Sequence, residues 1–174
     1  MPRWRAAVVA GLLVAGCPAR DGERHKPIDV ELDAGRPVRA GVRVPLPDGW
    51  TARVGSDQSL RAGPQDRVVL RIDQRAGERR EFPTARELEE GLRASVPGAH
   101  VERISAVEEA DFVIVQLKLY PPRDGGARPV PIALGARRMG DDLFLCATEP
   151  GASEDEVEKA ALACGQLAQA APKP

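Results

Sequence analysis

Two short segments of this chain are apolar on both sides of an extended backbone, and this pattern restricts the possible folds more than any other feature. Residues 112–115 are Phe-Val-Ile-Val, and residues 143–147 are Leu-Phe-Leu-Cys-Ala. A strand of this kind has to be covered on both faces, because neither row of side chains can be left in water. We therefore expect both segments near the centre of a sheet that has a layer of structure on each side.

Two amphipathic helices are predicted that can supply those layers. Thr84 with Glu87, and Ser153 with Glu156, match the capping box, in which the hydroxyl and the carboxylate bond free amides of the first helical turn. Apolar residues then recur every three or four positions, as Leu88, Leu92 and Val96 in the first helix and Val157, Ala160, Ala161, Cys164 and Leu167 in the second.

The remaining regular segments alternate as strands do. Extended segments are expected at 42–46, 50–54, 67–75, 101–107, 112–120, 131–138 and 143–147. In 67–75, Val68, Leu70 and Ile72 face one way and a row of arginines faces the other. The row suggests an anion site, but Asp73 interrupts it, and a solvated sheet face is the favoured interpretation.

The order of elements predicts an α+β fold, with an antiparallel β-sheet flanked by two α-helices. It resembles the PsbP-like α-β-α sandwich, the fold of a photosystem II extrinsic subunit and of many small bacterial lipoproteins. The resemblance covers Val42 to Leu167 and rests on the opening Val44-Pro45-Leu46-Pro47-Asp48-Gly49-Trp50, the order of elements, and the closing hairpin and helix. We expect one domain over residues 42–168, with a disordered tail over 169–174 and fraying past Leu167.

The N-terminus looks like an export signal. Arg3 and Arg5 precede eleven small or apolar residues at 6–16, too few for a permanent membrane span, which needs about 20. The segment ends in Val14-Ala15-Gly16-Cys17, which resembles the lipobox of bacterial lipoprotein signal peptides. The resemblance implies removal of residues 1–16, lipidation of Cys17 and acylation of its new amine. The alternative is a plain secretory signal with an accidental cysteine.

Residues 17–41 are expected to join the lipidated cysteine to the domain as a flexible tether, because the segment is polar and broken by Pro and Gly. The alternation of Ile28, Val30 and Leu32 fits a short edge strand equally well, and both interpretations remain open. Pro18 follows the cysteine where inner-membrane lipoproteins of enterobacteria have Asp. The predicted location is therefore the bacterial cell envelope, with the outer membrane facing the periplasm favoured.

Cys146 and Cys164 are left as an even pair in an exported chain. Cys146 has the strand parity of Phe144, and Cys164 lies on the apolar stripe of the last helix, so a disulfide between them can fasten that helix to the sheet. A redox or metal role is the rival interpretation. The two thiols do not form a Cys-x-x-Cys motif, and only His100 is spare as a further zinc ligand within the domain.

The sequence contains none of the common nucleophile, phosphate-binding, metalloprotease, dinucleotide or calcium motifs. Ser105 near His100, and the pair Asp141 and Asp142, are explained by strand and turn chemistry. With 25 Lys and Arg against 26 Asp and Glu, the chain lacks the positive field of a nucleic-acid binder. We expect no catalysis, cofactor or metal. The predicted function is a membrane-anchored envelope lipoprotein that binds a protein partner or assists assembly of an envelope complex; the alternative is a carrier of a small apolar ligand.

Overall fold

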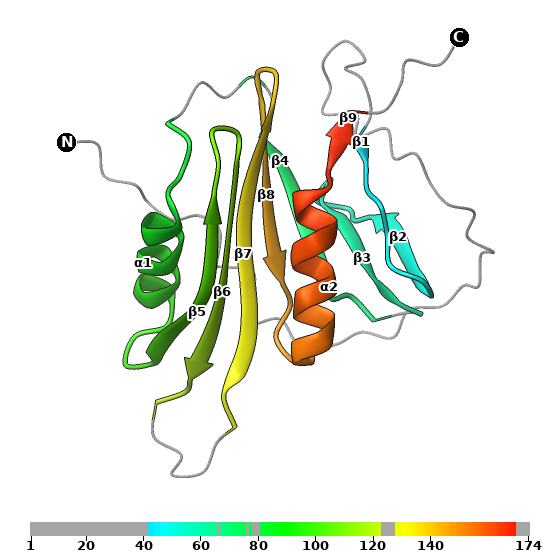
Figure 1. Ribbon diagram of the computed structural model, residues 1–174. Helices are drawn as coiled ribbons and strands as arrows, with labels where there is room; N and C mark the ends of the chain where they lie inside the picture. Colours follow the sequence, from blue (N-terminus) through cyan, green and yellow to red (C-terminus); the bar gives the residue numbers. More distant parts are fainter. Residues whose placement is uncertain (1–41, 66, 76, 78–80, 123–127, 170–174) are drawn as a thin grey trace, which may run out of the picture.

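A seven-stranded antiparallel sheet and two helices make up most of the computed structural model, which describes residues 42–169 except 66, 76, 78–80 and 123–127 (Figure 1). The strand order is β2-β3-β4-β8-β7-β6-β5, and β1 and β9 form a separate two-stranded sheet. The bounds are β1 Val42–Arg43, β2 Trp50–Val54, β3 Leu60–Pro64, β4 Leu70–Arg75, α1 Ala85–Ser95, β5 His100–Glu108, β6 Phe112–Tyr120, β7 Val130–Met139, β8 Asp142–Thr148, α2 Glu154–Gly165 and β9 Ala168–Gln169.

The two helices cover opposite faces of the sheet. Phe112 and Ile114 of β6 belong to a buried cluster with the residues of α2, whereas Val113 and Val115 belong to a second cluster with Leu92 of α1. Successive side chains of a strand point to opposite faces, so the two clusters lie on either side of the same strand. The predicted α+β class and the two-sided covering of the apolar strands are confirmed.

Both helices begin where the capping boxes predict. The Thr84 and Ser153 side chains accept hydrogen bonds from the amides of Glu87 and Glu156, and each glutamate carboxylate accepts one from the amide of its cap residue. The two caps satisfy amides that have no partner within the helix, which fixes the first turn of α1 and α2.

Three strand predictions need correction. The strand expected at 67–75 begins at Leu70, and Val69 is buried instead of Val68, because the Val69 amide donates to Ala62 O across a tight connection from β3. Strand β3 was not expected. The strand expected at 42–46 is limited to β1, where Val42 and Arg43 pair with β9.

The C-terminal end is more ordered than the sequence predicts. Instead of fraying past Leu167, the chain forms β9, in which Ala168 pairs with Arg43 and Gln169 with Val42. Leu167 is buried in the α2-side cluster and therefore holds the end of the chain against the sheet. Residue 169 is thus a strand residue and not part of a disordered tail, and residues 170–174 lie outside the described part.

A disulfide joins Cys146 of β8 to Cys164 of α2, with the two Cα atoms 6.3 Å apart. Both sulfur-bearing residues are buried in the α2-side cluster. Gly135 of β7 pairs with Cys146, and a Cβ built on it would come within 3.2 Å of the Cys164 sulfur. The absence of a side chain at Gly135 leaves the space that the disulfide occupies.

Candidate functional site

Among the described residues, no helix covers the part of one sheet face that is formed by β2, β3 and β4. Helix α1 packs against β5, β6 and β7, and it does not extend over β2, β3 and β4 (Figure 1). On these three strands Ala52, Leu60 and Leu70 point into the α2-side cluster. Alternation therefore turns Arg61 and Arg71 to the uncovered face. We call the uncovered surface of β2, β3 and β4 the open face.

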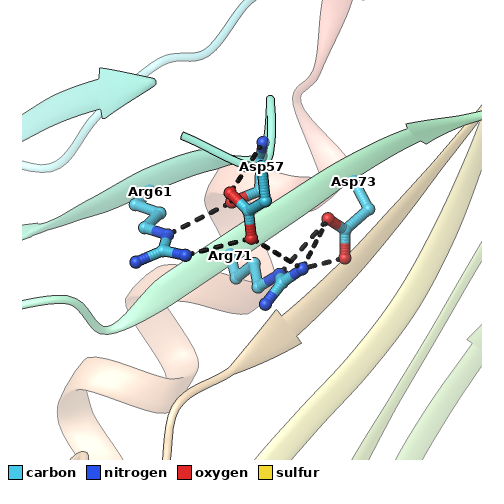
Figure 2. A network of polar contacts seen from close by, with 5 residues as sticks. Asp57, Arg61, Arg71 and Asp73 are labelled. Atoms are coloured by element: carbon cyan, nitrogen blue, oxygen red, sulfur yellow. Dashed lines mark hydrogen bonds and ion pairs between the residues drawn. The ribbon is translucent and has the colours of Figure 1, made fainter. Parts of the chain in front are cut away.

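Figure 2 shows the polar network at the centre of the open face. Arg61 Nη2 lies 3.0 Å, and Arg71 Nη2 3.2 Å, from the same carboxylate oxygen of Asp57. Arg71 also donates from Nε and Nη2 to the two carboxylate oxygens of Asp73, at 3.1 and 3.0 Å. Asp57 thus bridges two arginines from neighbouring strands, and Asp73 holds one of them in a bidentate pair.

The turn between β2 and β3 places Asp57 in this position. The Gln58 amide donates to Gly55 O at 3.0 Å, and Gln58 has a positive φ of 63°. Asp57 Oδ1 accepts from the amide of Ser59 at 3.2 Å and from its hydroxyl at 2.6 Å. An Asp that bonds the backbone two residues further on is a common way to stabilise a turn. The bonds from Ser59 therefore fix the position of the Asp57 carboxylate independently of its contacts with the two arginines.

These contacts keep the network charged. The hydrogen bond from the Ser59 hydroxyl holds the pKa of Asp57 well below its usual range, and the Ser59 amide and Arg61 lower it further. The hydrogen bonds from Arg71 to Asp73 raise the pKa of the arginine. Of the arginine row expected in 67–75, Arg71 pairs with Asp57 and Asp73, and Arg67 pairs with Glu156. These acids offset much of the positive charge of the row, which favours the solvated-face interpretation over an anion site.

A shallow hollow lies beside the network at the end of the sheet. Thr51, Arg53, Gln65 and Val68 are among its lining residues, and its space of about 20 Å³ suits about one water molecule. The Thr51 hydroxyl closes part of it by donating to Gln65 O at 3.0 Å. This hollow is not the enclosed apolar pocket that a carrier of a small apolar ligand needs, and the carrier function stays a prediction.

His100 and Ser105, which the sequence analysis considers as candidates, do not form a common site. The ring of His100 lies 5.4 Å from the ring of Tyr120 at the start of β5, while the Ser105 hydroxyl donates to Gln116 at 3.1 Å. Each side chain has its own cross-strand neighbour. Cys17 and the whole of 17–41 lie outside the described residues.

The turn before β8 uses its two aspartates differently. Asp141 is exposed, whereas Asp142 is buried and accepts hydrogen bonds from the Gly77 amide at 2.8 Å and from Gln74 Nε2 at 3.0 Å. Asp142 therefore fastens the connection after β4 to the β7–β8 hairpin. Across the described ranges, no three His, Cys, Asp or Glu residues gather closely enough to hold a metal ion.

Glu89 is a buried charged residue that the sequence analysis does not predict. Glu89 of α1 is 6% exposed and pairs with Arg93 of the same helix and with Arg103 of β5, whose Nε donates to Glu89 Oε2 at 2.7 Å. Its position four residues after Ala85 and three before Leu92 placed it on the buried face, which was the available signal. The contact attaches α1 to the edge of the sheet.

No protein-family model matches the chain, and no curated protein matches it. Among solved structures, the chain is similar to LpqN of Mycobacterium tuberculosis, described as involved in cell envelope biogenesis, with a TM-score of 0.43 and 19% sequence identity over 77% of this chain and 86% of that chain. No residue role is transferred from it. In the part of the chain that the structure describes, no helix has the length and apolar character to cross a membrane.

Proposed function

We propose that this chain is a lipid-anchored, non-catalytic lipoprotein of the bacterial envelope whose domain binds a protein partner or assists assembly of an envelope complex. The observation that carries the proposal is the sequence Val14-Ala15-Gly16-Cys17 at the end of a short apolar stretch. Acyl chains contribute about 0.8 kcal/mol per buried CH₂, and stable anchoring needs more than one of them. A triacylated Cys17 meets that requirement.

The spacing between anchor and domain supports a tethered role. Residues 18–41 separate Cys17 from Val42, the first described residue. A flexible chain of this length has a root-mean-square reach of about 27 Å, enough to lift a domain clear of lipid headgroups. The predicted membrane is the outer one, with the domain in the periplasm, because Pro18 stands where an inner-membrane retention signal would have Asp.

The open face supports partner binding. Arg61 and Arg71 are each about one third exposed, so their guanidinium groups are held in place yet reachable. Arginine is enriched at protein–protein interfaces, and a side chain that is already ordered loses less entropy on binding. A surface with paired charges of both signs favours a protein partner over a simple anion. We therefore place partner contact at Asp57, Arg61, Arg71 and Asp73.

The anchor is tested by intact mass and membrane fractionation of the native product. We expect wild-type protein to begin at Cys17, to carry acyl chains and to sediment with the outer membrane. Cys17→Ser should remove the added mass and the membrane association. Pro18→Asp is the matched control, because it should keep the acyl mass while shifting the protein toward the inner membrane in an enterobacterial host. An unmodified thiol at Cys17 in the wild type would refute the proposal.

Partner binding is tested by crosslinking in cells with charge reversals. Arg61→Glu with Arg71→Glu should abolish recovery of a protein that the wild type recovers. Arg86→Glu is the control, since Arg86 is 81% exposed on α1 and the substitution reverses one charge away from the open face; Arg61→Glu alone is the variant of equal charge change on that face. Recovery of that protein at equal yield by all of these forms would exclude the open face as the contact site.

A further inference from the structure

In the part of the chain that the structure describes, strand β2 ends the sheet and has one edge without a partner strand. Within the described residues it pairs only with β3, so the backbone groups on its outer edge have no ladder. Unpaired strand edges readily accept another strand. The opposite edge, β5, is less accessible, because it has a bulge at 103–105 and Arg93 donates to Val101 O from α1.

The two sides of β2 differ in chemistry. On the α2 side, Trp50 and Val54 flank the buried Ala52, and Val54 is 41% exposed although it is a large apolar residue. On the open face, Arg53 lies directly opposite Arg61 of β3. Arg61 is neutralised by Asp57, but Arg53 has no ion pair within the described residues. Like charges directly opposite each other are unfavourable, so a carboxylate beside Arg53 would stabilise this edge.

We propose that the outer edge of β2 is the docking site for residues 28–33 of this same chain, which add an eighth strand to the sheet. The segment reads Ile-Asp-Val-Glu-Leu-Asp, so one row of its side chains is apolar and the other is entirely acidic. As a strand it presents the apolar row to the side that holds Trp50 and Val54, and the acidic row to the side that holds Arg53. A segment that is apolar in both rows would match the side with Trp50 and Val54 but would leave Arg53 without a carboxylate.

The pairing is antiparallel, as are all the pairs in this sheet. Placing Glu31 opposite Arg53 sets Val30 opposite Val54 and Leu32 opposite Ala52. Each of these pairs matches in character, and a shift of one residue would reverse every side chain and place acid against Val54. The chemistry therefore selects the register.

The chain is long enough for this docking. Residues 34–41 link the segment to Val42, and residues 44–49 link β1 to β2. An extended chain covers about 3.3 Å per residue, so these links reach about 26 and 20 Å, enough for the segment to return to β2. If Cys17 is lipidated as proposed above, docking leaves residues 18–27 as the tether, with a reach of about 17 Å.

Disulfide trapping tests the register in the full chain carrying Cys17→Ser. Glu31→Cys with Arg53→Cys places two thiols directly opposite on one face, at a Cα separation of about 4.5–5.5 Å that suits a disulfide. Val30→Cys with Arg53→Cys is the control, because neighbouring positions on opposite faces direct the Cβ atoms apart. We expect an intramolecular crosslink in the first pair and at least about tenfold less in the second.

Crosslinks that appear only between two chains would overturn the proposal in favour of a second copy that donates the strand. Equal trapping of both pairs, or trapping of neither, would also overturn it. Native mass and melting temperature of each variant, read before oxidation, show whether it remains a folded monomer.

Hydrogen exchange gives a measurement that needs no cysteine. Amides of 28–33 should be protected in the wild type, Arg53→Glu should lower that protection by a few-fold, and the added change Glu31→Arg should restore it. Arg75→Glu, on the open face of β4 and distant in the sheet order, should leave it unchanged. Protection that is absent in the wild type, or that fails to recover in the double variant, would refute the pairing.

Discussion

Asp57 connects more of the open face than any other single residue. Its carboxylate fixes the turn between β2 and β3 through Ser59, and it bridges Arg61 and Arg71 on adjacent strands. Its partners were not visible in the sequence for two reasons. Arg71 belongs to a strand 14 positions away, and β3, which carries Arg61, was not expected.

The depressed pKa of Asp57 has a consequence for acid stability. A group whose pKa is lower in the folded state adds stability above its unfolded pKa of 3.8, and that stability is lost as the pH falls through the folded pKa. Urea unfolding should therefore show a loss of stability below about pH 4 that is weaker in Asp57→Asn. At pH 7 the substitution should cost less than about 1 kcal/mol, because the carboxylate is partly exposed. Asp48→Asn, at an exposed turn, is the control, and an identical acid profile for both variants and the wild type would contradict the assignment.

At Gly135 the close packing of neighbouring atoms, and not the backbone conformation, requires glycine. An added Cβ would lie 2.7 Å from Ile114 Cδ1 and 2.9 Å from Val113 O, and the second atom is backbone that cannot easily move. Gly135→Ala should lower the free energy of unfolding by about 1–3 kcal/mol. Gly91→Ala in α1, where nothing lies within 4 Å, should instead raise it by about 0.5–1 kcal/mol. Chemical denaturation of both variants checks the pair, and the same sign of change in both would show that the packing argument is wrong.

At the scale of elements, the sequence predicts those boundaries that depend on residues within one helical turn of each other. The ends of α1 and α2 follow from capping boxes whose members lie three residues apart. Strand β3 was not predicted because its sequence, Leu-Arg-Ala-Gly-Pro, has only one large apolar residue, Leu60, and ends in glycine and proline. Its pairing with β2 and β4 supplies the stability that its own sequence does not show.

The two caps give independent predictions. Thr84→Ala and Ser153→Ala should each lower the free energy of unfolding by about 1 kcal/mol, because each removes the acceptor for an amide of the first turn. Since α1 and α2 lie on opposite faces of the sheet, the double variant should show the sum of the two effects. Ser56→Ala, at an exposed turn position, should change stability by less than about 0.5 kcal/mol. Thermal or urea unfolding measures the four variants against the wild type, and a strongly non-additive double variant would show that the helices are coupled through the sheet.

At the scale of the whole molecule, the central strands determined the architecture. Segments that are apolar on both faces require two covering layers, and two amphipathic helices were available to form them. The sequence could not show how far each layer extends. Helix α1 packs against β5, β6 and β7, and among the described residues β2 to β4 are left without a helix on that face. The pairing of β1 with β9 was not predicted for a similar reason. Both strands are short, and each is a strand because it pairs with the other.

The disulfide between Cys146 and Cys164 is the covalent link between the sheet and its α2 layer. It closes a loop with a sequence separation of 18, and the chain-entropy estimate for such a loop is about 3 kcal/mol. Cys146→Ala with Cys164→Ala should lower the free energy of unfolding by about that amount while the far-ultraviolet circular dichroism of the native state is retained. Urea unfolding of the wild type with and without reductant separates the crosslink from the packing, since reduction removes the bond and keeps both side chains. If the reduced wild type is as stable as the oxidised form, α2 is held by the apolar contacts of Val157, Ala160 and Leu167 alone.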